Sequence, residues 1–397
     1  MMTGLTHRFM AVLAAAALAA PASAAVPDKK EGPNIAAPHA ILIDAVHGSV
    51  LFERDADRLI YPASLAKLMT AEYVFHLIEE RAINLDDEYT VSENAWRKGG
   101  APSHSSTMFA KLGSKVSVDN LLRGMIIQSA NDACIVLAEA IAGNEAEFGR
   151  RLTARAREIG LVKSTFTNSN GLPDPDEKMT TRELALLARH IILTYPDFYK
   201  LFGEKEFTWN NIRQQNRNPL LGTVAGADGL KTGFTKEAGY GLVGSAVQDG
   251  MRLIVVVTGE KTANERAEDA KKLLEWGFHN FEPRTLFAAG VTLGSAKVFG
   301  GATGHVPLQA DGPVVVMMPK AGGERLIARI IYRGPVPAPV KQGEPIGMIK
   351  VWRGDKVVLE QPLHAAAAVG RGNLSQRAFD AVTELVIALF RAGAEKL

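Results

Sequence analysis

The sequence has little cysteine, little net charge and few of the features that mark metal or nucleotide sites. Its 397 residues include one cysteine, Cys134, so the chain cannot form an internal disulfide. The formal net charge of +2 gives no bulk attraction to nucleic acid, and we expect no nucleic-acid partner. With 47% hydrophobic and 22% charged residues, the chain has the composition of a globular protein of two or three domains.

Motifs for metals and cofactors are also missing. The nine histidines are scattered and none belongs to an HExxH motif, so we expect no metal. Residues 239–244 fit GxGxxG, but they lead into a hairpin instead of a strand-to-helix turn, which argues against a nucleotide site. There is no G-x-S-x-G motif either. We therefore expect no cofactor.

The N-terminus has the pattern of a signal peptide. His7 and Arg8 precede an apolar run that is too short to span a bilayer comfortably, and Ala22-Ser23-Ala24 follows it as a cleavage pattern. We expect residues 1–24 to be removed and the mature chain to be exported. An uncleaved membrane anchor is the alternative.

The order of strand and helix signals predicts an α+β fold. An early hairpin turns at His47-Gly48, mainly helical segments fill about residues 85–200, and later strands turn at Asp249-Gly250. This order predicts one antiparallel sheet built from both ends of a first domain, residues 25–282, with helices around it and a helical lobe inserted. Cys134 lies in a small and apolar stretch of that lobe, where a role in core packing is expected.

Residues 283–372 change in character and predict a second domain. Their short β-rich segments, separated by glycine and proline, indicate a small all-β sandwich. The triplet Arg353-Gly354-Asp355 is expected at the tip of one of its hairpins.

The last segment, residues 373–397, predicts an amphipathic helix. Its apolar side gathers Ala378, Val382, Leu385, Val386, Leu389 and Phe390. Such a helix at the end of an exported chain favours attachment to the outer face of a membrane, although its acidic and basic residues balance. Packing against its own domain or a second copy is the alternative.

Ser64 and Lys67 are the first candidates for chemistry. A serine before an apolar helix is commonly only an N-cap, but Lys67 lies one turn further on the same face. A lysine in an enclosed site beside another cation loses its proton more easily and could then activate the serine hydroxyl.

Two further short motifs follow. In IIQSANDAC, Ser129 and Asn131 can point the same way, while Asn131 with Asp132 is also expected to cap the next helix. In GLKTGFT, Lys231 and Thr232 lie on a predicted strand, and the glycine at 233 permits close approach of another backbone. Each motif carries little weight alone.

Together, SxxK, SxN and KTG are the motif set of penicillin-binding proteins and serine β-lactamases. With EKEFTWNNIRQQNRNPLL and MRLI, nearly the whole mature chain resembles the serine D-alanyl-D-alanine carboxypeptidases, the low-molecular-mass penicillin-binding proteins. The resemblance implies a β-lactamase/transpeptidase-like catalytic domain that acts on peptidoglycan stem peptides. It also implies that β-lactam antibiotics are covalent inhibitors and that the protein is periplasmic, held peripherally on the cytoplasmic membrane.

The resemblance also assigns roles to residues. Ser64 is implied as the acylated nucleophile, Lys67 as its base and Ser129 as the proton relay. Backbone N–H groups of Ser64 and Phe234 are implied as the oxyanion hole. Substrate binding is implied for the remaining candidates, which are Asn131, Lys231, Thr232, Gly233, Arg252 and Arg213.

Phe234 departs from relatives that carry histidine after KTG, and it leaves fine specificity open. A β-lactamase of this fold is one alternative, although the sequence has no E-x-x-L-N segment for fast deacylation. The pattern also allows a DD-endopeptidase or a non-catalytic wall-binding protein.

Overall fold

The structure is a computed structural model that describes residues 32–321 and 325–383. The predicted signal peptide, residues 1–24, and the last part of the predicted tail helix, residues 384–397, lie outside the described residues.

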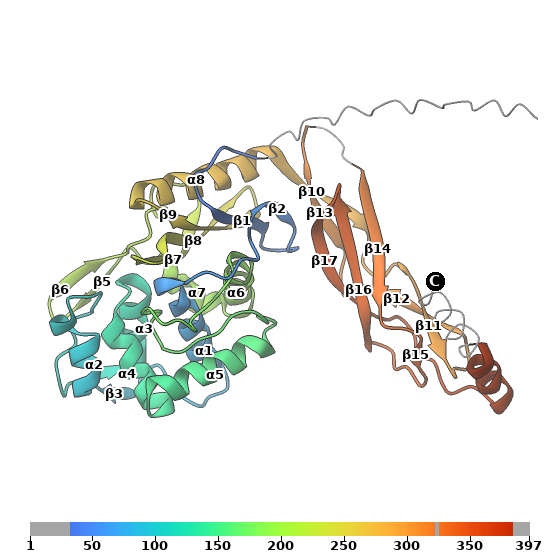
Figure 1. The fold of residues 1–397 in the computed structure, drawn as a ribbon, viewed down its shortest axis with the longest axis horizontal. Coiled ribbons are helices and arrows are strands. Elements are labelled where there is room, and N and C mark those ends of the chain that lie inside the picture. The colour runs from blue at the N-terminus through green and yellow to red at the C-terminus, as the bar shows by residue number, and fades with distance from the viewer. Residues whose placement is uncertain (1–31, 322–324, 384–397) are drawn as a thin grey trace, which may run out of the picture. The chain divides into compact units, whose positions relative to one another are not determined.

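The core of the first part is a five-stranded antiparallel sheet in the order β2-β1-β9-β8-β7 (Figure 1). Strand β1 from the start of the chain pairs with β9 along its whole length, which confirms that both ends build one sheet. Asp249 and Gly250 both have positive φ, as a tight hairpin between β8 and β9 requires. The five strands are β1 (His39–Asp44), β2 (Val50–Arg54), β7 (Ala227–Thr235), β8 (Gly239–Gln248) and β9 (Met251–Glu260).

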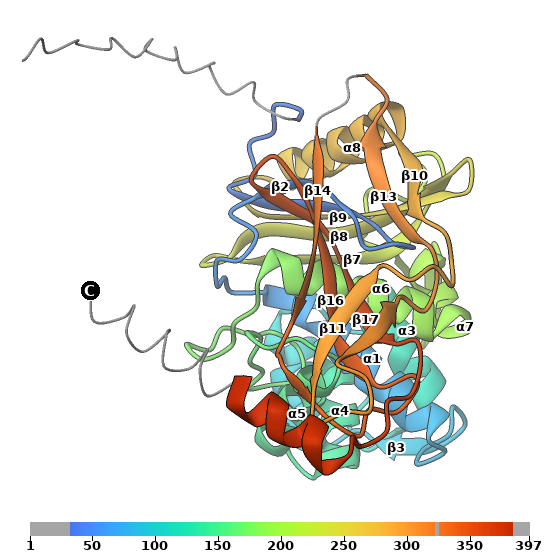
Figure 2. The same ribbon diagram turned by 90° about the vertical axis from the view of Figure 1, so that its right-hand side faces the viewer.

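Helices cover both faces of this sheet (Figures 1 and 2). On one face α8 (Ala263–Asn280) packs on β8 and β9, and its start is fixed by a capping box between Thr262 and Glu265. On the other face α6 (Thr181–Thr194) packs on β1 and β9. Because both faces are covered, residues Leu253–Val257 form a continuous buried run in β9.

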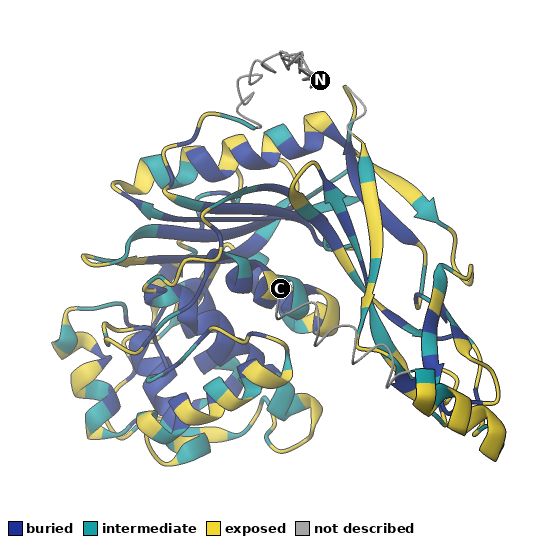
Figure 3. Ribbon diagram, turned by 45° about the vertical axis from the view of Figure 1, so that its right-hand side comes forward, coloured by how far each residue is buried: buried dark blue, intermediate teal, exposed yellow. Residues whose placement is uncertain are grey.

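The helical lobe lies beyond α6 and contains the largely buried helix α4 (Asn131–Ala142) (Figure 3). Residues 131–138 of α4 are all buried, among them the free thiol of Cys134, which confirms its place in the core. The other helical elements are η1 (Ala63–Ala66), α1 (Lys67–Glu79), α2 (Glu93–Lys98), η2 (Ala101–Ser103), α3 (Val118–Ile127), α5 (Glu145–Glu158), α7 (Pro196–Tyr199) and η3 (Lys200–Gly203). Two short hairpins complete the lobe: β3 (Glu88–Thr90) with β4 (Lys115–Ser117), and β5 (Glu206–Trp209) with β6 (Ile212–Gln215).

The β-rich part has two sheets around its own apolar core, so the predicted fold class is confirmed. One sheet pairs β10 (Phe281–Phe287) with β13 (Val314–Pro319), and the other has the order β14-β16-β17-β12-β11-β15. Gly354 and Asp355 connect β16 to β17, as expected for a hairpin tip. The strands of the larger sheet are β11 (Gly294–Phe299), β12 (His305–Gln309), β14 (Leu326–Tyr332), β15 (Val336–Pro337), β16 (Pro345–Arg353) and β17 (Lys356–Ala365).

Candidate active site

Ser64 is held at the tip of a tight turn that leads into α1. It is the second residue of η1, and the preceding Ala63 has a φ of 49°, a strained conformation for a residue with a Cβ. Neither η1 nor α1 has a side-chain cap hydrogen bond, so Ser64 is not an N-cap. Its hydroxyl oxygen instead accepts a hydrogen bond of 3.0 Å from Lys67 Nζ.

Lys67 is the first residue of α1 and is only 2% exposed. Its Nζ also donates to the backbone oxygen of Asn170 at 2.6 Å. Burial lowers the pKa of Lys67 to about 8, and the positive charge of Arg217 acts in the same direction. A Cys134 thiolate would oppose this shift, but burial raises the pKa of Cys134 to about 12, so the thiol stays neutral when Lys67 titrates. A neutral amine at this position can keep its donation to Asn170 and accept the proton of Ser64.

The carbonyl of Asn170 is fixed by the loop that precedes α6. Asn168 Oδ1 accepts the backbone N–H groups of Asn170 at 3.1 Å and of Gly171 at 2.7 Å. At Gly171, where φ is 76°, a Cβ would lie 1.9 Å from the backbone oxygen of Ala63. The loop can therefore lie against the backbone beside the nucleophile only because residue 171 has no side chain.

Ser129 and Asn131 stand at the entrance to α4. Ser129 is buried with a φ of 64°, and Asn131 donates its backbone N–H to Ser106 O at 2.7 Å and its Nδ2 to Ser105 Oγ at 3.0 Å. Among the described residues, the buried Oδ1 of Asn131 has no hydrogen-bond partner. It remains available to a ligand.

The expected capping role of Asn131 and Asp132 is wrong. The N-cap of α4 is Ala130, and no side chain caps this helix. Asp132 instead accepts from Thr107 Oγ1 at 2.6 Å and from the backbone N–H groups of Met108 and Ala110. These bonds hold the segment that carries Ser105 and Ser106 next to Asn131.

Strand β7 brings the second lysine to the same place. Lys231 is buried, its Nζ donates to Thr232 O at 2.8 Å, and burial together with the charges of Lys67 and Arg217 holds its pKa well below the usual value. The positive charge of Lys67 thus favours loss of the proton from Lys231. Thr232 beside it is also buried.

The next two residues of β7 complete this wall. A Cβ at Gly233 would lie 3.2 Å from both Leu65 N and Pro62 O, so the strand passes directly against η1. Phe234 follows with 51% of its surface exposed, and its ring stacks on Tyr240 with centroids 4.1 Å apart. The backbone at Phe234 thus lies beside the turn that carries Ser64.

The structure gives the two predicted arginines other partners. Arg252 donates to both carboxylate oxygens of Asp228, at 2.8 and 2.7 Å, and to Ser245 Oγ. Arg213 is exposed on β6 and forms an ion pair with Glu206. Within the described residues, the bonds of both arginines thus go to side chains outside the site around Lys67 and Lys231, which we call the lysine site.

Arg217 is the site residue that sequence reasoning missed. Its Nη1 donates to Ser106 Oγ at 2.6 Å, and its charge lowers the pKa of both buried lysines. The sequence signal was the NRN segment, residues 216–218, within a stretch that the family resemblance already included.

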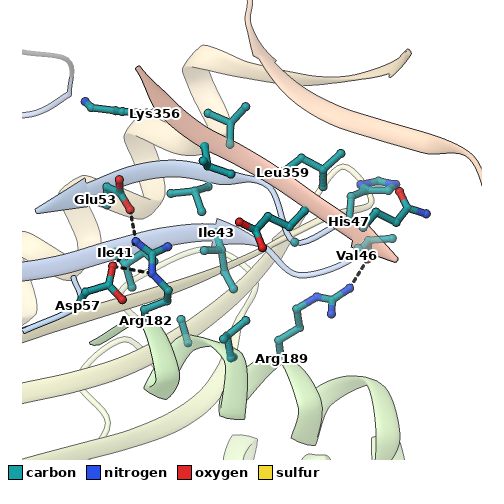
Figure 4. Close-up of a pocket in the computed structure, with 18 of the residues that line it drawn as sticks. Ile41, Ile43, Val46, His47, Glu53, Asp57, Arg182, Arg189, Lys356 and Leu359 are labelled. Atoms are coloured by element: carbon teal, nitrogen blue, oxygen red, sulfur yellow. Dashed lines mark hydrogen bonds and ion pairs between the residues drawn. The ribbon is translucent and has the colours of Figure 1, made fainter. Parts of the chain in front are cut away.

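A cavity of about 820 Å³ lies away from the two buried lysines, next to β1, β2, α6 and β17 (Figure 4). Arg182 in its wall is paired with Glu53 and Asp57, and Arg189 donates to the backbone oxygens of Ala45 and Val46. Since β2 and β7 are opposite edges of the sheet, this cavity is separate from the lysine site.

Neither a membrane span nor a metal cluster occurs in the part of the chain that the structure describes. Within residues 32–321 and 325–383, no helix is long and apolar enough to cross a membrane. The same residues hold no group of three or more His, Cys, Asp or Glu side chains suited to a metal ion.

Comparison with known proteins gives the family. The family model for D-alanyl-D-alanine carboxypeptidase matches residues 25–262, and that for the C-terminal domain of penicillin-binding protein 5 matches residues 281–371. D-alanyl-D-alanine carboxypeptidase DacC of Escherichia coli K12 is 40% identical over 368 residues, which cover 92% of each chain.

Solved structures support the same family. Penicillin-binding protein 5 from Haemophilus influenzae is 37% identical with a TM-score of 0.71, and the match covers 85% of this chain and 99% of that one. Penicillin-binding protein D2 from Listeria monocytogenes, solved in the ampicillin-bound form, is 32% identical with a TM-score of 0.54, covering 62% of this chain and all of that one. The chain belongs to the D-alanyl-D-alanine carboxypeptidases, a family of serine hydrolases, as its three motifs had predicted.

Proposed function

We propose that this protein is a serine DD-carboxypeptidase that removes the terminal D-alanine from peptidoglycan stem peptides. One observation carries the proposal: the buried Nζ of Lys67, which has no ion pair among the described residues, lies 3.0 Å from Ser64 Oγ. A lysine that served only the fold would be solvated or paired with a carboxylate, whereas this one is placed to act as a base.

Acylation follows from that pair. Neutral Lys67 accepts the hydroxyl proton while Ser64 Oγ attacks the carbonyl carbon of the penultimate D-alanine. The backbone N–H groups of Ser64 and Phe234 stabilise the oxyanion, and one such donor is worth about 10²–10³ in rate. Ser129 relays a proton to the departing amine, the peptide bond breaks and D-alanine leaves. Water then cleaves the acyl-enzyme and returns the proton to Ser64.

The remaining residues orient the substrate. Asn131, with its free Oδ1, holds the amide backbone of the stem peptide. Lys231, Thr232 and the exposed Arg217 attract the terminal carboxylate, while Gly233 leaves room for the turn that carries Ser64. Arg217 takes this role in place of Arg252, whose charge is already paired with Asp228.

β-Lactam antibiotics act on the same nucleophile. Ring opening by Ser64 gives an acyl-enzyme with the same ester linkage, since the β-lactam resembles the D-alanyl-D-alanine unit. The structure of the ampicillin-bound relative supports this inhibitor class for the family.

The proposal is tested with a D-alanyl-D-alanine-terminated peptide and with penicillin. We expect the wild-type protein to release free D-alanine and to gain the mass of penicillin on the peptide that contains Ser64. Ser64→Ala should lose both reactions, and a variant that still acquires the adduct would refute the assignment. Splitting of cross-linked dimers into monomeric peptides would indicate an endopeptidase, whereas a carboxypeptidase releases D-alanine from linear peptides and leaves the cross-link intact. Rapid turnover of a chromogenic cephalosporin would instead indicate a β-lactamase.

We further propose that the protein is exported and bound peripherally to the outer face of the cytoplasmic membrane. The described part of the tail helix supports this: Asp380 accepts from Gly300 N at 2.7 Å and Gln376 Nε2 donates to Ala302 O, so its polar side contacts the β-rich part. Leu374, Phe379 and Val382 are left 61–82% exposed. An outward apolar side of this kind is what a membrane surface binds.

Deletion of residues 374–397 tests the attachment. We expect the full chain to sediment with anionic and with neutral vesicles, because apolar burial drives binding, and the truncated chain to stay in solution. Unchanged sedimentation of the truncated chain, or of a Phe379→Asp and Val382→Asp double variant, would show that the helix is not the anchor.

A further inference from the structure

A pocket of about 180 Å³ opens beside the nucleophile. Ala63 directly precedes Ser64, and Thr235 directly follows Phe234, so the pocket adjoins both backbone donors of the proposed oxyanion hole. The loop after Gly171 closes the opposite wall. The lining includes Ala63, Gly171, Thr235 and the acidic residues Asp174, Glu177 and Glu237.

The direction of β7 decides which part of a substrate reaches this pocket. β7 is an edge strand, so its outer side is free to take an extended peptide. In the function proposed above, Thr232 binds the terminal carboxylate and the N–H of Phe234 binds the acyl oxygen. A strand advances about 3.3 Å per residue, so the next position along it, at Thr235, meets the residue that precedes the D-alanyl-D-alanine unit.

The pocket is acidic. Its described lining includes the carboxyl groups of Asp174, Glu177 and Glu237 and no lysine, arginine or histidine. Two lysines adjoin the lining in the sequence. Lys178 has its Nζ 3.1 Å from the ring centroid of Tyr61, where a cation–π contact engages it, and exposed Lys236 lies between the lining residues Thr235 and Glu237.

Glu177 is the unusual member of this lining, because it is only 1% exposed. Its Oε2 accepts from Thr167 N at 2.8 Å, from Thr167 Oγ1 at 2.9 Å and from Asn168 N at 3.3 Å. Its Oε1 is also buried and has no hydrogen-bond partner in the part of the chain that the structure describes. Burial raises the pKa of Glu177 to about 7. A buried carboxyl oxygen without a donor is destabilising, and an incoming ammonium group would supply that donor.

We propose that this pocket binds a cationic side chain on the residue that precedes the D-alanyl-D-alanine unit. The enzyme thereby favours stem peptides in which that residue carries a free amine. Exposed Glu237 attracts the amine, and the free oxygen of Glu177 pairs with it at the inner end of the pocket. This inference rests on the proposed function, because it uses the substrate direction that the oxyanion hole and carboxylate site define.

Two synthetic substrates test the proposal. Nα-acetyl-L-lysyl-D-alanyl-D-alanine carries a free ε-amine, and its Nε-acetylated form is the same peptide without the charge. We expect wild-type kcat/KM for D-alanine release to be about tenfold higher for the free amine, as one charge-assisted hydrogen bond supports.

Three variants test whether the pocket causes the preference for the free amine. Glu177→Gln keeps an oxygen that can accept from Thr167 and Asn168 but removes the negative charge, and Glu237→Gln removes the charge at the exposed rim. Each should lower the ratio of the two kcat/KM values, and the double variant should bring it within twofold of one. Asp176→Asn is the matched control: this exposed carboxyl belongs to the same loop but does not line the pocket, so its ratio should equal that of wild type.

The outcomes are distinct. A wild-type ratio below twofold overturns the pocket proposal while D-alanine release from both peptides still supports the carboxypeptidase. A tenfold ratio that survives both substitutions places the cation site elsewhere and also overturns it. Release from neither peptide refutes the proposed function, and this inference with it. Penicillin labelling of Ser64 and the melting temperature show whether each variant is folded, and Glu237→Gln provides the test if Glu177→Gln is unstable.

Discussion

Helix α1 buries two ionisable side chains within a turn and a half of each other, and their surroundings differ. Glu72 is fully buried and accepts from Arg155 Nη2 at 2.9 Å, from His190 Nε2 at 3.1 Å and from Tyr195 OH at 3.2 Å. Burial alone would raise its pKa, but the bonds from His190 and Arg155 outweigh burial and lower it. Lys67 meets only a hydroxyl and a backbone carbonyl.

The comparison separates a charge that serves the fold from one that serves chemistry. The hydrogen bonds from His190 and Arg155 keep the pKa of Glu72 low, so it stays ionised and ties α1 to α5 and α6. Lys67 lacks an anionic partner among the described residues, and its neutral form is therefore accessible near physiological pH. Four measurements test this distinction.

Lys67→Met should have the largest effect on the reaction. Loss of the base is expected to slow penicillin acylation of Ser64 by about 10²–10⁴. The free energy of unfolding should stay the same or rise, because an apolar side chain of similar length replaces a desolvated amine. Stopped-flow acylation and urea unfolding measure the two effects. A large loss of stability would show that Lys67 serves the fold as well.

Glu72→Leu should have the opposite outcome. Removing the carboxylate leaves Arg155 and His190 without their buried partner, so we expect a loss of about 3–5 kcal/mol in the free energy of unfolding. The folded fraction should still acylate at the wild-type rate. Glu158→Leu is the control, since this exposed residue also contacts Arg155 and its loss should cost about 1 kcal/mol or less. Equal stability of the two variants would contradict the comparison.

Arg217→Ala should raise KM for a D-alanyl-D-alanine peptide by about 10–100-fold, the worth of a hydrogen bond between charged groups. Arg213→Ala is the matched variant. Its guanidinium is paired with Glu206 on the surface, so KM should change less than twofold. The reverse result would restore the substrate-binding role that the family resemblance implied for Arg213.

The pH dependence of acylation should show the smallest effect. The neutral amine is the active form, and Lys67 is protonated below its pKa of about 8, so the rate should rise roughly tenfold between pH 7 and pH 9 and then level off. Lys67→Met should remove this rise, and a flat wild-type profile over the range would contradict a lysine base.

The motifs and the fold class were accessible from the sequence for physical reasons. Alternating strands, turn residues and apolar helices are local patterns, and SxxK depends on spacing within one helical turn. The order of early strands, helical block and late strands then predicted that the early and late strands form one sheet. The separate apolar core of the β-rich part followed from its change in composition.

The rest required the three-dimensional path of loops. Arg213 and Arg217 are four residues apart with similar neighbours, and only the path of the chain after β6 brings the second to Ser106. The acceptor on Asn170 is a backbone atom 103 residues from Lys67, so the residue type at that position does not indicate the hydrogen bond. The sequence predicted a helix cap at Asn131 and Asp132 because capping preferences depend only on neighbouring residues. They do not include the distant segment, residues 105–110, whose backbone N–H groups Asp132 binds instead.

The carbonyl of Asn170 has a consequence for how the enzyme tolerates mutation. Every amino acid supplies the same carbonyl oxygen, so no substitution at 170 deletes the group that orients the base. Substitutions that would displace this carbonyl are instead those at the residues that shape the loop, chiefly Asn168 and Gly171. A bacterium that escaped an antibiotic by displacing this loop would misalign the amine for its own substrate as well, and resistance by that route would cost turnover.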